Sequence, residues 1–181
     1  MNRFRIALPL QVVLPDEWVV GMSARLYTND LREVGRIEHL RTTTRRVWGL
    51  VASVLDTASL FIGNADTALC SIKLPGGADY ELFDDAGTLG RIAPKTFSVW
   101  PELECTDEQG VLVGRIKPGI TKVRLIEGER MILGQRTGKT SADPFAGHAG
   151  WNITSRDATD VDARLLLCAI ALDLVPSSAG S

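Results

Sequence analysis

The chain has 181 residues, 45% of them hydrophobic, which suits one globular domain and excludes disorder by composition. Its 20 Lys and Arg residues against 22 Asp and Glu residues give a formal net charge of −2, which argues against a general nucleic-acid binder. The cysteines Cys70, Cys105 and Cys168 fit no metal-ligand or redox spacing. We interpret them as small buried apolar residues in a reducing cytoplasm.

Residues 45–62 form the first segment with a long-period pattern. Apolar residues recur there at close to helical spacing, which predicts a helix to about Asp56 and then a strand. Helices that combine basic and aromatic side chains lie at membrane interfaces, so Trp48 makes this segment a candidate for membrane contact. Packing across the end of a barrel is the favoured interpretation. A basic lead-in precedes the segment: Arg41, Arg45 and Arg46.

A short sequence motif, called a phrase below, is repeated in the first two thirds of the chain. Residues 84–92 (DDAGTLGRI) resemble residues 107–116 (DEQGVLVGRI), and residues 34–37 (VGRI) repeat the ending. Each phrase joins two strand-like runs through a turn, in which Gly supplies a positive φ and Asp bonds its own backbone. Residues 126–129 (IEGE) predict one further turn. Strands at this close spacing indicate an antiparallel meander or barrel, with Gly87 and Gly110 in hairpin turns.

Residues 134–150 are rich in Gly, Thr, Ser and Asp, which predicts a long loop. Within this segment, residues 134–140 (GQRTGKT) look like a phosphate-binding loop. Three residues separate the two glycines where that motif needs four, and Pro144 follows where a helix should begin. A hairpin loop is therefore favoured over nucleotide binding.

The C-terminal region ends in an apolar run, residues 165–172 (LLLCAIAL). A helix without a polar face is buried on all sides or lies in a membrane, and a membrane span needs about 20 apolar residues. We therefore expect a buried helix at about residues 160–175, with Thr159 as its N-cap. Asp173 is expected to mark the point where the helix leaves the barrel. A central helix after a series of strands indicates a β-barrel threaded by its own C-terminus.

The residues that carry chemistry lie in ordinary settings. His39 and His148 have polar or glycine-rich neighbours, so exposed loop positions are expected for both. Asp157, Asp160 and Asp162 offer oxygens to calcium but lack the Gly and Glu of an EF-hand loop, so capping of the helix start is favoured. No nucleophile signature surrounds any Ser or Cys. The sequence thus predicts no catalytic residue, no metal and no cofactor.

Three segments carry a family resemblance: residues 80–92 (YELFDDAGTLGRI), residues 151–154 (WNIT) and residues 164–173 (RLLLCAIALD). Together they resemble the tubby C-terminal-like superfamily, which includes tubby domains, phospholipid scramblases and plant LURP-one-related proteins. The resemblance implies a closed barrel of about twelve strands around the C-terminal helix. It also implies a protein that binds lipid or associates with membranes. The chain has no cysteine cluster and no Pro-rich region of the scramblase kind.

These observations predict one domain, residues 1–181, that acts as a cytoplasmic, non-enzymatic module, peripheral at the membrane and not transmembrane. Its expected partner is the anionic phospholipid headgroup, and no nucleic acid is expected. The alternatives are a protein-interaction or scaffold domain with no lipid role and, least favoured, a nucleotide-dependent enzyme that uses residues 134–140. The basic residues expected to contact lipid are Arg41, Arg45, Arg46, Lys117, Lys122 and Arg124.

Overall fold

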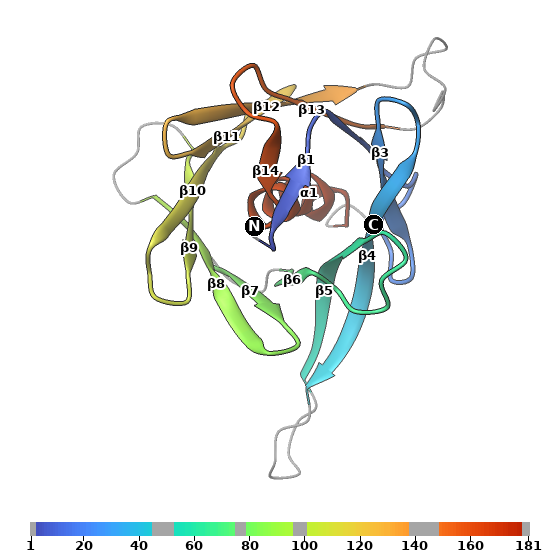
Figure 1. The fold of residues 1–181 in the computed structure, drawn as a ribbon. Coiled ribbons are helices and arrows are strands. Elements are labelled where there is room, and N and C mark those ends of the chain that lie inside the picture. Colours follow the sequence, from blue (N-terminus) through green and yellow to red (C-terminus); the bar gives the residue numbers. More distant parts are fainter. Residues whose placement is uncertain (1–2, 45–52, 75–78, 96–100, 138–148, 179–181) are drawn as a thin grey trace.

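The structure is a computed structural model that describes residues 3–44, 53–74, 79–95, 101–137 and 149–178. Twelve antiparallel strands in these residues form a closed barrel, and two more form a separate ribbon (Figure 1). The barrel strands are β2 (Leu10–Val13), β3 (Ser23–Thr28), β4 (Glu33–Thr44), β5 (Ser53–Ile62), β6 (Cys70–Lys73), β7 (Tyr80–Asp84), β8 (Gly87–Pro94), β9 (Leu103–Asp107), β10 (Leu112–Lys117), β11 (Lys122–Glu127), β12 (Arg130–Thr137) and β13 (Gly150–Thr154).

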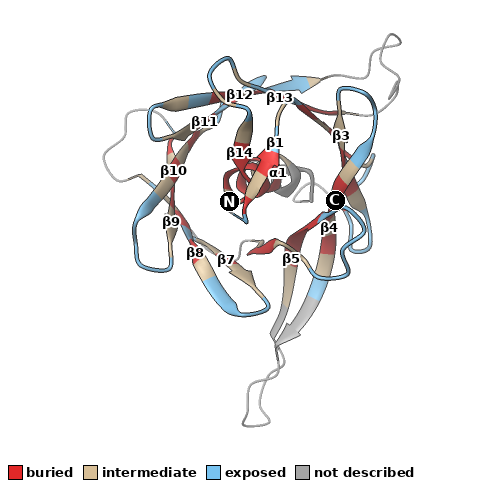
Figure 2. Cartoon of the chain, in the orientation of Figure 1, coloured by how far each residue is buried: buried red, intermediate tan, exposed pale blue. Residues whose placement is uncertain are grey.

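The strands follow one another around the barrel in chain order, and β13 pairs with β2 to close it. The helix α1 (Ala163–Ser178) lies inside (Figure 1). The leucines at positions 165–167 are fully buried, as are the inward faces of the strands around them (Figure 2). The predicted barrel around a buried hydrophobic C-terminal helix is therefore confirmed.

Each Gly-Arg-Ile repeat lies at a bend in the barrel wall. The glycines of the repeats, Gly35, Gly90 and Gly114, each lie beside a shift in register between neighbouring strands. A Cβ at Gly90 would lie 1.9 Å from the carbonyl oxygen of Thr106, and Gly35 and Gly114 face strand carbonyls in the same way. Glycine allows the backbones to approach and bend, as closure of a barrel requires. The isoleucines two positions later, Ile37, Ile92 and Ile116, fill the core.

The predicted hairpin turns are confirmed. Gly110 lies in the turn between β9 and β10 with a φ of 79°, and Gly87, with a φ of 138°, closes the turn between β7 and β8 as the first residue of β8. Asp84 and Asp107 each accept hydrogen bonds from two backbone N–H groups of their own turn, at 2.8–3.2 Å. The turns are thus stabilised by the Asp and Gly chemistry visible in the repeat.

The helix begins later than its sequence indicates. β1 (Arg5–Ala7) pairs with β14 (Asp160–Asp162), so residues 160–162 are extended and α1 starts at Ala163. Asp162 caps the helix, because its Oδ1 accepts a hydrogen bond from the N–H of Arg164 at 2.9 Å. The prediction of Thr159 as N-cap was wrong, because the pairing of β14 with β1 keeps residues 160–162 extended and the helix begins only after them.

Asp173 is paired near the rim of the barrel, where β12 ends and β13 begins. Trp151 donates its indole N–H to Asp173 Oδ2 at 3.0 Å, and Arg136 lies 3.5 Å from the other oxygen. The side chain is only 11% exposed, and α1 continues past it to Ser178. This paired, nearly buried carboxylate fixes the helix to β12 and β13.

Two further predictions are corrected by strand pairing. Residues 53–56, expected at the end of a helix, belong to β5, which pairs with β4 over ten residue pairs. Residues 134–137, expected in a loop, extend β12 along β13. Interstrand hydrogen bonding overrides the local pattern in both places. Residues 45–52 with Arg45, Arg46 and Trp48, and residues 138–148 with Lys139 and His148, lie outside the described residues.

His39 is buried in β4, where sequence reasoning expected an exposed loop. Its ring stacks on Trp18, with ring centroids 5.0 Å apart. The three cysteines are fully buried, as predicted, and burial raises the pKa of the Cys70 thiol to about 12. These groups are part of the core and are shielded from reagents.

The alternation of strand direction divides the connections between two ends of the barrel. We call one the turn end, where residues 29–32, 63–69, 85–86, 108–111, 128–129 and 155–159 connect the strands. The β1–β14 ribbon lies across this end, in front of α1 (Figure 1). We call the other the loop end, where β2 connects to β3 through residues 14–22 and β10 connects to β11 through residues 118–121.

Candidate functional site

A basic wall covers the outer face of β10 and β11 near the loop end. Side chains alternate along each strand, so Ile116 and Val123 point into the core while Lys117, Lys122 and Arg124 point outward. Lys117 and Arg124 are directly opposite each other across the two strands. Three residues predicted from the sequence as a lipid-binding set are thus brought together on one surface.

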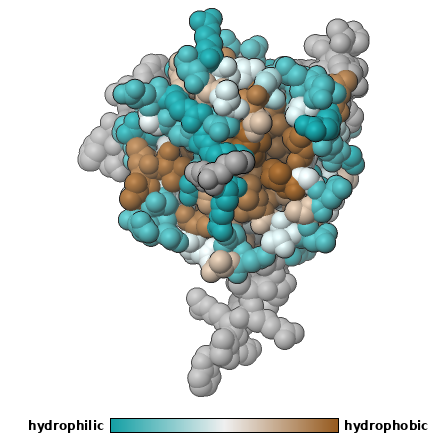
Figure 3. Space-filling model, in the orientation of Figure 1, coloured by the Kyte–Doolittle hydropathy of each residue, from teal (hydrophilic) through white to brown (hydrophobic). Residues whose placement is uncertain are grey.

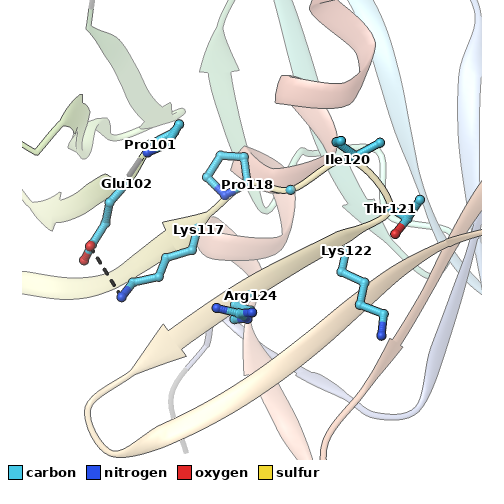
Figure 4. Close-up of a pocket in the computed structure, with 9 residues that line it drawn as sticks. Pro101, Glu102, Lys117, Pro118, Ile120, Thr121, Lys122 and Arg124 are labelled. Carbon is cyan, nitrogen blue, oxygen red and sulfur yellow. Dashed lines mark ion pairs between the residues drawn. The ribbon is translucent and has the colours of Figure 1, made fainter. Parts of the chain in front are cut away.

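The hairpin between these strands ends in an exposed apolar residue. Ile120 is 94% exposed at the tip, between Pro118 and the basic residues of β11 (Figure 4). The turn needs Gly119, because a Cβ there would lie 2.6 Å from the carbonyl oxygen of Lys122. Sequence reasoning missed Ile120, although the pattern KPGITK in residues 117–122 places an apolar residue in a turn between lysines.

A pocket of about 570 Å³ lies beside the hairpin and is lined by its residues together with Pro101 and Glu102. The Glu102 carboxylate is nearly buried and faces Lys95, Arg115 and Lys117 at 3.5–3.6 Å. Figure 4 shows Lys117 reaching toward this carboxylate. Glu102 thus holds one end of the basic wall in place.

The wall keeps an excess of positive charge. Lys95, Arg115 and Lys117 face Glu102 and Glu104. Together with Lys122 and Arg124 this makes five cations against two carboxylates, a net charge of +3. Within the described part of the chain, Lys122 and Arg124 form no ion pair and no side-chain hydrogen bond. These two exposed cations are therefore free to bind an anion.

Arg41 lies elsewhere. It is on β4, six strands from β10 in the closed order of twelve, which is the opposite side of the barrel. Its Nε lies 3.6 Å from Asp56 Oδ1, the carboxylate of its cross-strand neighbour. The structure therefore separates Arg41 from the other described members of the predicted set.

The turn end has the opposite charge. Each of its six connections carries one exposed carboxylate: Asp30, Asp66, Asp85, Glu108, Glu129 and Asp157. Only Arg32 and Arg156 oppose them in these connections, which leaves a net charge of −4. Figure 3 views this end and shows polar residues around its periphery, with apolar residues gathered nearer its centre. The connections of the turn end are thus acidic, whereas the basic wall lies on strands near the loop end.

Comparison of the chain with models of protein families, with curated proteins and with solved structures found no match. The resemblance to the tubby C-terminal-like superfamily therefore stays a prediction. No helix in the described residues is long and apolar enough to cross a membrane. These residues also contain no group of three or more His, Cys, Asp or Glu side chains placed to hold a metal ion. What the basic wall offers chemically is attraction for anions beside an exposed apolar tip.

Proposed function

We propose that this protein is a non-enzymatic binding module that docks on membranes containing anionic phospholipids. The observation that carries the proposal is Ile120, a fully displayed apolar side chain flanked by the free cations Lys122 and Arg124. An apolar tip beside basic side chains matches the two layers of an anionic bilayer surface, which are hydrocarbon and charged headgroup.

The magnitudes are sufficient for reversible association. Each basic side chain near an anionic surface contributes about 1 kcal/mol, and full burial of an isoleucine contributes about 1.5–3 kcal/mol. Lys117 contributes less, because Glu102 already faces it at 3.5 Å. The electrostatic part acts over about 10 Å at 0.1 M salt, so binding should weaken as salt rises.

A flotation assay tests the proposal with vesicles of phosphatidylcholine, with or without phosphatidylserine. The wild-type protein should float only with phosphatidylserine vesicles, and less at high salt. The double variant Lys122→Glu/Arg124→Glu should lose binding. The matched control Arg32→Glu/Arg156→Glu makes the same change in net charge at the turn end and should bind as the wild type does. An equal loss of vesicle binding in both variants would mean that only the net charge of the protein matters, which would contradict the proposed site.

One observation favours the alternative of a protein-interaction module. The turn end exposes the apolar side chains of Val111, Leu112 and Met131, which an anionic membrane would not attract because the surrounding connections are acidic. Exposed apolar residues with a polar surround are typical of protein interfaces. If the wild-type protein ignores phosphatidylserine vesicles even at low salt, this alternative replaces the lipid proposal.

A further inference from the structure

A second apolar element lies at the loop end, in the connection between β2 and β3. Val19, Val20 and Met22 are 47%, 42% and 44% exposed there. They follow one another closely in a segment whose neighbours Leu14 and Trp18 are buried. The segment therefore displays three apolar side chains from a base that is packed into the core.

Backbone hydrogen bonds hold this segment against β4. The N–H of Gly21 donates to the carbonyl of His39 at 2.8 Å, and the N–H of His39 donates to the carbonyl of Met22 at 3.0 Å. The stacking of Trp18 on His39 fixes the other side of the segment. Gly21 has a φ of 91°, which a valine or methionine would not adopt without strain. The exposed side chains are therefore held outward in a defined conformation.

The position of the segment relates it to the hairpin that carries Ile120. Only β12 and β13 separate the β10–β11 hairpin from the β2–β3 hairpin around the barrel, and both connections lie at the loop end. The two connections therefore lie at the same end of the barrel. The six exposed carboxylates of the turn-end connections repel an anionic surface, and the basic wall near the loop end attracts one.

We propose that residues 17–22 are a second membrane-contacting element and that the barrel docks end-on, with its loop end on the anionic bilayer. This inference rests on the proposed function. Asp16 and Glu17 are exposed in the same connection, so the segment itself does not attract anionic lipid. Attraction comes from the basic wall, and the segment adds apolar contact once the barrel has arrived. Glu17→Gln should therefore strengthen binding.

Single-cysteine labelling locates the contact. The native cysteines are fully buried, and burial raises the pKa of the Cys70 and Cys168 thiols, so a fluorophore attaches in the native state only to an introduced cysteine. Val20→Cys and Ile120→Cys place an environment-sensitive label on the two loop-end elements. Val111→Cys is the matched control, because it replaces an exposed valine of the turn end. With phosphatidylserine vesicles, emission should shift to the blue at positions 20 and 120 and stay unchanged at position 111.

The outcomes separate the two proposals. A response at position 120 without one at position 20 overturns end-on docking and leaves the proposed function intact. No flotation of the wild-type protein overturns both. A response at position 111 shows that the turn end faces the lipid and contradicts both proposals as well. In flotation, Val19→Ser/Val20→Ser should weaken binding about tenfold, while the control Val111→Ser/Leu112→Ser should not change it.

Discussion

The two ends of the barrel are built from the same strands and differ in what connects them. At the turn end, Asp84 and Asp107 accept hydrogen bonds from backbone N–H groups of their hairpins, and the β1–β14 ribbon lies across the opening. Both ends expose apolar side chains, but Ile120 at the loop end lies beside the basic wall, whereas Val111 at the turn end lies among acidic connections. The ribbon and the Asp turns stabilise the turn end, and the loop end presents apolar side chains near free cations.

The ribbon shows how strongly the turn end is fastened. Arg5 donates to Glu127 at 2.6 Å and also bonds Asp160, while Arg130 reaches the same two carboxylates at 2.9 Å and 2.7 Å. These ion pairs tie β1, β11, β12 and β14 together. We therefore expect substitutions of these paired charges and of the core to change folding, and substitutions of the exposed loop-end residues to change binding.

Disruption of the central helix should prevent the whole barrel, including both of its ends, from folding. Leu167→Asp places a carboxylate at a fully buried position, where an unpaired charge costs several kcal/mol against a typical total stability of about 5–15 kcal/mol. The variant should not fold in soluble form, as measured by soluble yield and circular dichroism. Leu112→Asp, at an exposed position, is the control and should fold. A soluble Leu167→Asp variant with a cooperative melt would refute the central-helix fold.

Alanine substitutions at two glycines should show that a bend in the barrel wall is more sensitive to an added Cβ than a hairpin turn is. Gly90→Ala must adopt a φ of 153° and also brings a Cβ within 1.9 Å of a backbone oxygen, so a loss of more than about 2 kcal/mol is expected. Gly87→Ala has a φ of 138° with open space around it, and about 1 kcal/mol is expected. Urea unfolding measures both. Equal losses would mean that the close approach at Gly90 carries no cost.

Acid should loosen the turn end through Asp160. Hydrogen bonds from Arg5 and Arg130 lower the pKa of this carboxyl from 3.8 to about 2. A depressed pKa stabilises the folded state fully above the ordinary value, and the stabilisation is lost as pH falls through the folded value. The difference in urea midpoint between the wild type and Asp160→Asn should therefore be largest above about pH 4 and shrink toward pH 2.

The smallest effect on stability is expected at the loop end. Ile120→Ser removes an exposed side chain, so the free energy of unfolding should change by less than about 0.5 kcal/mol. The same variant should bind phosphatidylserine vesicles more weakly. A large loss of stability would show that Ile120 serves the fold, and the contrast between the two ends would then fail.

Much of the architecture follows from local features of the sequence. The Asp and Gly residues of the 84–92 and 107–116 phrases predict hairpins because a turn is decided by residues close together in the chain. The apolar run at 165–172 predicts a buried helix because a helix without a polar face has no other stable place in water. Lys117, Lys122 and Arg124 could be grouped because one hairpin connects them.

Only the tertiary structure decided the remaining features, because each depends on which distant segments meet when the barrel closes. The burial of His39 requires Trp18, and the pairing of Asp173 requires Trp151. The start of the helix depends on β1, more than 150 positions earlier, which holds residues 160–162 extended. The sequence also groups Arg41 with the other basic residues, whereas closure of twelve strands places it on the opposite wall. Local chemistry thus determines turns and helix, and closure of the barrel determines which side chains become neighbours.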